Sequence, residues 1–117
     1  MIYSLSYTDA MPSENVGGYA KAWFIRIRPR YKDDVGILEH EKIHVWQWWR
    51  TLGFHSLFYL LSKKYRLNAE VEAYKEQLKF APATSNPERY KDMYAGFIAD
   101  NYGLDVSKGE VLKLLTQ

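Results

Sequence analysis

The chain has 117 residues, a net charge of +2 and 47% hydrophobic residues, which fits one folded domain over residues 1–117 and excludes wholesale disorder. It has no cysteine and three histidines. Disulfide frameworks, cysteine-based zinc sites and cysteine nucleophiles are therefore excluded, and any metal must be held by histidine and carboxylate. The net charge is too small to require a nucleic-acid partner, and we expect none.

The longest apolar stretch is residues 52–61, about ten residues, whereas a membrane span needs roughly 20. The start of the chain, MIYSLSYTDAM, has neither the basic first region nor the apolar run of a signal peptide. We therefore expect a cytoplasmic protein without a membrane span.

Strand-forming side chains dominate the N-terminal part. Residues 2–7 (IYSLSY) form one short predicted strand, and a polar loop that ends at the turn pair Gly17-Gly18 follows it. Residues 19–28 alternate in polarity, with Trp23, Ile25 and Ile27 on the face that we expect to be buried. This alternation predicts a single strand over residues 19–28.

A long helix is predicted next, over residues 34–52. Asp33 or Asp34 is placed to cap its start, and Gly53 follows its end. Its apolar side chains lie nearly all round the helix, which predicts a central, buried helix. We accordingly expect its three tryptophans to lie in the core: Trp46, Trp48 and Trp49.

Four further segments complete the chain. Helices are predicted over residues 55–65, 68–80 and 87–102, with a loop over residues 81–87 before the last of them. Asn86 is expected to cap this last helix, with Pro87 at its first position. Ser107 and Glu110 have capping-box spacing and open a short final helix. The predicted class is α+β, with a small N-terminal hairpin or sheet followed by a bundle of four or five helices around the helix 34–52.

The middle of that central helix reads His40-Glu41-Lys42-Ile43-His44, an HExxH motif. Residues i and i+4 share one helix face, so both imidazoles can reach one metal ion. Glu41 lies about 100° from His40 around the helix, where it can face a metal-bound water without binding the metal. Zinc lowers the pKa of such a water to about 7, and a neighbouring carboxylate can accept its proton.

A catalytic zinc ion needs a third protein ligand, and the helix over residues 68–80 offers two candidates. Glu70 follows His44 by 26 residues, which leaves room for a connecting helix and an antiparallel return. Glu72 points about 160° away from Glu70, so it becomes the ligand if the helix is rotated. Both glutamates can instead belong to a solvated helix face.

HExxH on one helix and a glutamate on a later one resemble the gluzincin zinc peptidases, whose second helix often carries ExxxD or ExxAD. Here Glu70-x-x-Ala73-Tyr74 matches ExxA, with tyrosine at the acidic position. The resemblance implies that Glu70 is the third ligand and that Tyr74 stands where the family has a residue that orients a ligating histidine. It further implies that residues 20–28 are an edge strand that pairs with an extended peptide. It also implies a minimal single-domain member, similar to bacterial and phage-encoded sequences that continue as HxxQ, here to Gln47.

His55 is the remaining histidine, a candidate ligand or donor to the reaction oxyanion, or only a residue at a helix start. The expected function is that of a zinc-dependent metallopeptidase, in which His40, His44 and Glu70 bind Zn²⁺ and Glu41 activates water to cleave a peptide or protein substrate. The alternative is a non-catalytic module whose metal site is closed by His55 or Glu72, with a structural or interaction role.

Overall fold

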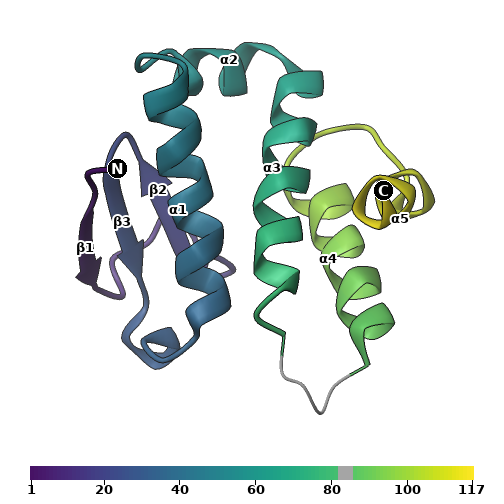
Figure 1. Ribbon diagram of the computed structural model, residues 1–117, viewed down its shortest axis with the longest axis horizontal. Coiled ribbons are helices and arrows are strands. Elements are labelled where there is room, and N and C mark those ends of the chain that lie inside the picture. Colours follow the sequence, from purple (N-terminus) through teal and green to yellow (C-terminus); the bar gives the residue numbers. More distant parts are fainter. Residues whose placement is uncertain (82–85) are drawn as a thin grey trace.

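The computed structural model describes residues 1–81 and 86–117, where a three-stranded sheet precedes five α-helices (Figure 1). The α+β prediction is confirmed. None of the helices in these two segments is long and apolar enough to cross a membrane. The elements in chain order are β1 (Ser4–Tyr7), β2 (Gly18–Lys21), β3 (Phe24–Ile27), a 3-10 turn (Pro29–Tyr31), α1 (Val35–Arg50), α2 (His55–Leu61), α3 (Lys63–Leu78), α4 (Pro87–Asn101) and α5 (Lys108–Thr116).

The sheet has the strand order β1-β3-β2, with β3 parallel to β1 and antiparallel to β2. The prediction of one strand over residues 19–28 is wrong, because the chain reverses at Ala22 and Trp23. Ala22 takes a positive φ of 54°, which closes a tight hairpin without the glycine or asparagine that usually marks such a turn. Residues 20–28 are therefore not an edge strand: β3 lies in the centre of the sheet, and β2 is an edge.

Within β3 the predicted alternation is confirmed, because Ile25 and Ile27 are buried while the residues between and before them are exposed. The prediction is wrong for Trp23, which lies in the turn before β3 and is 39% exposed. Both isoleucines pack with Val45 of α1 and form a small apolar core between the sheet and that helix. The sheet is thereby fixed to one side of α1.

Helix α1 begins at the predicted cap, since the Asp34 carboxylate accepts a hydrogen bond from the Ile37 backbone N–H. Two residues with left-handed backbone, Leu52 and Gly53, follow its end. The prediction that its tryptophans lie in the core is wrong for Trp46 and Trp49, which are close to half exposed. The sheet and α3 cover two sides of α1 and leave these two rings on the outer surface.

The connection between α1 and α3 also differs from the prediction. The helix expected over residues 55–65 stops at Leu61, and α3 starts at Lys63 rather than at residue 68. Ser62 separates the two helices: its backbone is extended, and its hydroxyl accepts a hydrogen bond from the Tyr65 backbone N–H as the N-cap of α3.

The last two helices begin as predicted. Asn86 caps α4 with Pro87 at the first position, and Ser107 accepts the Glu110 backbone N–H at the start of α5. The predicted loop over residues 81–87 falls mainly on residues 82–85, outside the described part of the chain. Helices α3, α4 and α5 share a second apolar core, formed by Val71, Tyr74, Tyr94, Ala95, Ile98, Leu104, Val111 and Leu115.

Helices α1 and α3 lie antiparallel between the two apolar cores (Figure 1). At one end the backbone of Gly36 approaches Gln77 so closely that a Cβ at Gly36 would lie 3.2 Å from the Gln77 Cγ. Farther along, His44 faces Glu70. The interface between α1 and α3 is thus lined by polar side chains, which sets it apart from the two cores.

Replacing the cap that separates α2 from α3 tests this boundary. Ser62→Ala removes the acceptor for the Tyr65 N–H, so we expect the free energy of unfolding to fall by about 1 kcal/mol. Chemical denaturation followed by circular dichroism measures this change. Ser56→Ala, at an exposed serine of α2, is the matched control and should leave stability unchanged; equal effects of the two variants would contradict the capping role.

Candidate metal centre

The HExxH motif occupies the middle of α1, and its two histidines face α3. The His44 Nε2 atom lies 3.2 Å from Oε1 of Glu70, and the His40 Nε2 atom lies 3.5 Å from the same oxygen. One ligand atom from each of the three residues falls within 4.8 Å of the others. The structure therefore brings together the two imidazoles and the carboxylate that the spacing and the gluzincin resemblance indicated.

These three groups are nearly removed from solvent, and Glu70 is only 2% exposed. Burial alone would raise the pKa of Glu70, but the charge of His44 and hydrogen bonds from both histidines hold it well below its usual range. Burial likewise acts to lower the pKa of His44, and the charge of Glu70 outweighs it and raises that pKa to about 10. The cluster is thus built around a carboxylate that stays ionised and strongly attracts positive charge.

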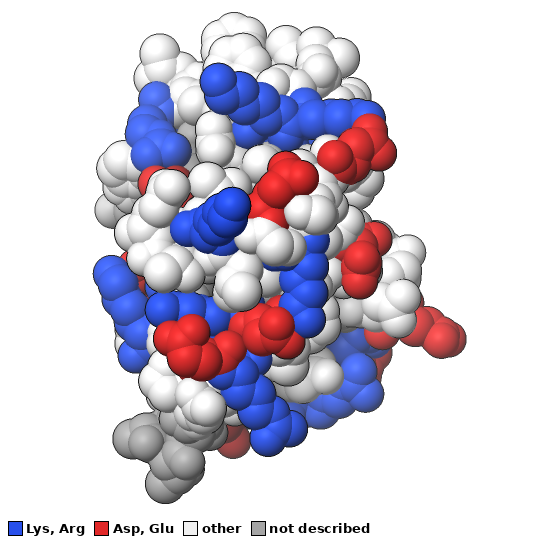
Figure 2. Space-filling model, turned by 90° about the vertical axis from the view of Figure 1, so that its right-hand side faces the viewer, with Lys and Arg blue, Asp and Glu red and all other residues white. Residues whose placement is uncertain are grey.

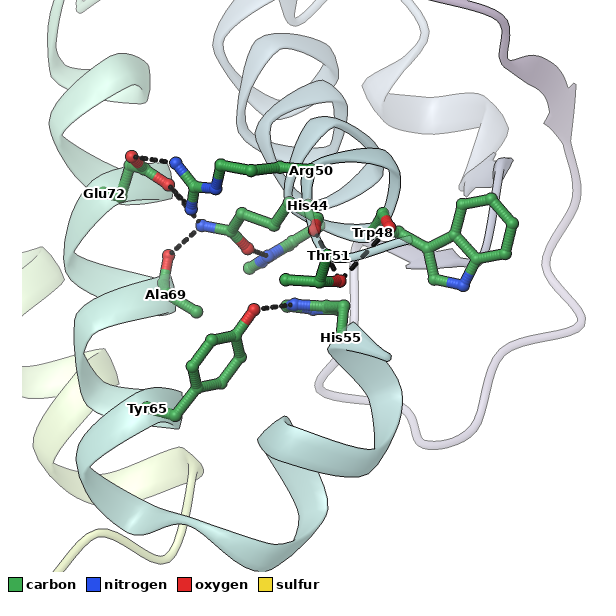
Figure 3. A network of polar contacts seen from close by, with 9 residues as sticks. His44, Trp48, Arg50, Thr51, His55, Tyr65, Ala69 and Glu72 are labelled. Carbon is green, nitrogen blue, oxygen red and sulfur yellow. Dashed lines mark hydrogen bonds and ion pairs between the residues drawn. The ribbon is translucent and has the colours of Figure 1, made fainter. Parts of the chain in front are cut away.

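Gln47 determines how the His44 ring is oriented. Its Nε2 donates to the backbone oxygen of Ala69 at 3.1 Å and to Oε1 of Glu72 at 2.7 Å (Figure 3). Because both partners are acceptors, the amide cannot be flipped, and the Gln47 oxygen must face His44 Nδ1 at 2.9 Å. His44 Nδ1 is therefore the donor of this bond, and its Nε2 faces Glu70.

Tyr59 holds the other oxygen of Glu70. Its hydroxyl donates to Oε2 at 2.6 Å, so the two histidines share Oε1 alone. Tyr59 lies on α2, one turn after His55, and both residues face inward from that short helix. Sequence reasoning missed Tyr59, although two polar rings four residues apart in an apolar helix are a signal that one helix face meets polar surroundings.

His40 is positioned by packing. Its ring lies edge-on to Tyr74, with centroids 4.3 Å apart, and its Nδ1 is buried with no hydrogen-bond partner among the described residues. The Tyr74 hydroxyl is 2.9 Å from that of Tyr102. Tyr74 thus contacts a histidine of the cluster through its ring, where the resemblance implied an orienting hydrogen bond.

The other two candidates lie outside the cluster, and Figure 3 shows the partners that each of them has instead. Glu72 accepts hydrogen bonds from Gln47 and Arg50, and its side chain is 44% exposed. His55 lies beside His44, with ring centroids 6.0 Å apart, but its Nδ1 is paired with the Tyr65 hydroxyl at 2.7 Å. Neither joins the group of atoms that could share one ion.

Glu41 is buried next to the cluster and only 6% exposed. Burial raises the pKa of its carboxyl, while the charges of His40 and His44 act in the opposite direction. No hydrogen bond contributes to this shift. Glu41 is therefore a buried carboxyl group beside the two histidines.

A divalent cation fits the residues present. Two imidazole nitrogens and one carboxylate oxygen are a donor set that zinc accepts, and three protein ligands are typical of sites that keep one position open. Burying the His40 Nδ1 without a partner among the described residues costs about 1–3 kcal/mol of folding free energy. A metal bond to the Nε2 atom of the same ring would offset this cost. Comparisons of the chain with protein-family models, curated proteins and solved structures found no match.

Replacing Glu70 and Glu72 by glutamine, one at a time, shows which of the two is the metal ligand. Glu70→Gln should weaken zinc binding by more than the 10–100-fold typical of residues that only support a ligand, because it removes a charged oxygen from the cluster. Glu72→Gln is the matched control and should change zinc affinity little, since its amide oxygen can still accept from Gln47. Competition with a coloured chelator measures both. Similar losses would mean that the ligand is wrongly assigned.

Gln47→Met tests the support of His44. Methionine fills a similar volume but cannot accept from His44 Nδ1, so we expect zinc affinity to fall by roughly 10–100-fold while the chain stays folded. The control is Gln77→Met at the far end of the same helix interface. Chelator competition gives the affinity, and circular dichroism checks the fold; an unchanged affinity for Gln47→Met would contradict the role.

Proposed function

We propose that this chain is a zinc-dependent hydrolase, a small metallopeptidase of the gluzincin type. His40, His44 and Glu70 are the residues that would hold the ion. The observation that carries the proposal is the convergence of their donor atoms within 4.8 Å of one another, beside the buried carboxyl of Glu41. The HExxH spacing and the glutamate of a second, antiparallel helix support the same conclusion.

Zinc, when bound, supplies a Lewis acid that polarises the substrate carbonyl and acidifies water. Glu41 provides the proton transfer. Its carboxylate accepts a proton from the attacking water and then donates it to the nitrogen of the leaving amine, so the peptide bond is replaced by an acid and an amine. The raised pKa of Glu41 supports this role, because a carboxyl that is too acidic would not accept the proton.

The sheet supports a peptide as substrate. β2 is an edge strand, and its first residue, Gly18, lies against Ile37, one turn before Glu41 on α1. The hairpin ends near the other half of the same helix, where Trp23 packs on Trp48. β2 therefore runs beside the part of α1 that carries Glu41, and an extended peptide paired with its free edge would pass close to the site.

The alternative of a closed, structural metal site needs a fourth ligand. Of the residues expected to supply it, Glu72 is occupied by Gln47 and Arg50, and His55 is paired with Tyr65. In residues 1–81 and 86–117, no other histidine or carboxylate belongs to the group. A three-ligand set favours the hydrolase.

Glu41→Gln tests the proposed proton transfer. Glutamine keeps the shape but cannot accept a proton, so we expect zinc binding to persist and hydrolysis of a denatured protein such as casein to fall about 10²–10⁴-fold. Glu39→Gln, two residues away on the same helix at a glutamate that pairs with Lys42, should keep normal activity. A Glu41→Gln protein with wild-type turnover, or a zinc-loaded wild type without hydrolytic activity, would refute the proposal.

A further inference from the structure

Helix α2 has its polar and apolar faces reversed relative to an ordinary surface helix. Its two polar rings, His55 and Tyr59, face the interior, where they contact Tyr65 and Glu70. Its large apolar side chains face outward. Together with the residues just before the helix they form what we term the apolar cap: Leu52, Phe54, Leu57, Phe58, Leu60 and Leu61.

The apolar cap is exposed to an unusual degree. Leu52 is 87% exposed, Leu60 is 70% exposed and Leu61 is 73% exposed. Single exposed apolar residues are common on protein surfaces, whereas a group of them on one short segment marks a surface that binds something. The cap forms one end of the molecule, where α2 crosses from α1 to α3 (Figure 1).

The charges around the cap have one sign in the sequence. Residues 42–69 contain five Lys and Arg and no Asp or Glu, and residues 51–62 contain no charged side chain at all. Figure 2 shows the corresponding end of the molecule as white, with blue Lys and Arg side chains directly below it and red acidic side chains beside some of them. The five cations are Lys42, Arg50, Lys63, Lys64 and Arg66.

Some of these cations are already paired. Lys42 contacts Glu39, Arg50 contacts Glu72, and Lys63 contacts Asp105. The last two pairs lie on the exposed surface, where such pairs are weak. Arg66 donates to the backbone oxygens of Tyr59, Leu60 and Tyr102, which leaves its charge uncompensated. Lys64 has no ion pair among the described residues. The rim of the cap therefore keeps positive charge that a negatively charged surface can meet.

Aromatic residues stand behind the cap. Trp46 lies on α1 one turn before Arg50, whose guanidinium stacks over its ring, and Trp49 precedes Arg50 directly. Both rings are close to half exposed. This arrangement matches the layers of a bilayer. Leucine and phenylalanine side chains suit the hydrocarbon layer, whereas cations and tryptophans suit the headgroup layer next to it.

We propose that the apolar cap docks this protein on the surface of an anionic lipid bilayer, with the cap side chains inserted and Lys64 and Arg66 among the headgroups. A second copy of the chain fits less well, because pairing two caps would bring the two positive rims together. Docking does not depend on the metal site, so its failure would leave the proposed hydrolase untouched.

The full chain is mixed with vesicles of phosphatidylcholine and phosphatidylserine, and separately with vesicles of phosphatidylcholine alone. Flotation measures the bound fraction, and tryptophan emission reports the surroundings of the rings. We expect binding to the anionic vesicles, a shift of emission to shorter wavelength, and weaker binding at high salt because headgroup attraction is screened.

Two variants separate the apolar and the charged parts. Leu60→Gln with Leu61→Gln should reduce the partition coefficient at least about tenfold, given the transfer free energy of leucine. Lys64→Gln should reduce it about fivefold, the effect of one charge near an anionic surface. The matched control is Met93→Gln with Phe97→Gln, two exposed apolar residues of α4 away from the cap, which should bind as the wild type does.

The outcomes decide as follows. Binding that is lost in the double leucine variant and kept in the α4 control supports the proposal. No binding to either vesicle, or binding that the leucine variant does not weaken, overturns it. Equal binding to neutral vesicles overturns the role of the cations. A concentration-dependent dimer that the leucine variant dissociates, in a protein that ignores vesicles, assigns the cap to a second copy and also overturns it.

Discussion

The carboxylate of Glu70, buried between α1 and α3, is the constraint on which the rest of the structure depends. An ionised carboxylate inside a protein is costly unless its charge is compensated and its oxygens are hydrogen-bonded. Here two histidines share Oε1, and the Tyr59 hydroxyl holds Oε2. These partners come from α1 and α2, and Glu70 itself lies on α3, so the position of one oxygen pair fixes how the three helices are arranged.

The polar interface is stable because it lies between two apolar cores and not inside one. The sheet packs on α1 through Ile25, Ile27 and Val45, while α3 packs on α4 and α5 through residues such as Ile98. Each helix is therefore anchored on its outer side by apolar burial, and its inner side is left for hydrogen-bonding groups. This division explains how a chain of 117 residues can dedicate its central interface to histidine, glutamate and glutamine.

The sequence was most informative where a property is local. The HExxH spacing predicted that His40 and His44 share a helix face, and the caps at Asp34, Asn86 and Ser107 follow from short-range hydrogen bonds. The errors involve tertiary context. The hairpin turn at Ala22 carries no glycine, and Trp46 and Trp49 of α1 are exposed because the sheet and α3 cover other sides of that helix.

For the candidate site, too, local contacts could be predicted from the sequence and contacts that depend on helix packing could not. Glu70 and Glu72 could be told apart only by how α3 is rotated, which depends on packing across α3 to α5. Gln47 bonds His44 within one turn of α1, and the HxxQ continuation includes it. Tyr59 was missed, since it lies on α2 and bonds a glutamate 11 positions away on α3. Its i, i+4 spacing from His55 was the one local signal for it.

Helix α2 connects the two features that the structure singles out. Its inner face supplies Tyr59 to Glu70 and places His55 beside His44, and its outer face carries the apolar cap. Its ends are held by the left-handed residues Leu52 and Gly53 and by the Ser62 cap, while Arg66 ties its last carbonyls to α3. The seven residues of α2 therefore separate the cap from the cluster by the width of one helix. A surface that binds the cap would therefore lie against the outer face of the helix whose inner face supplies Tyr59 to Glu70.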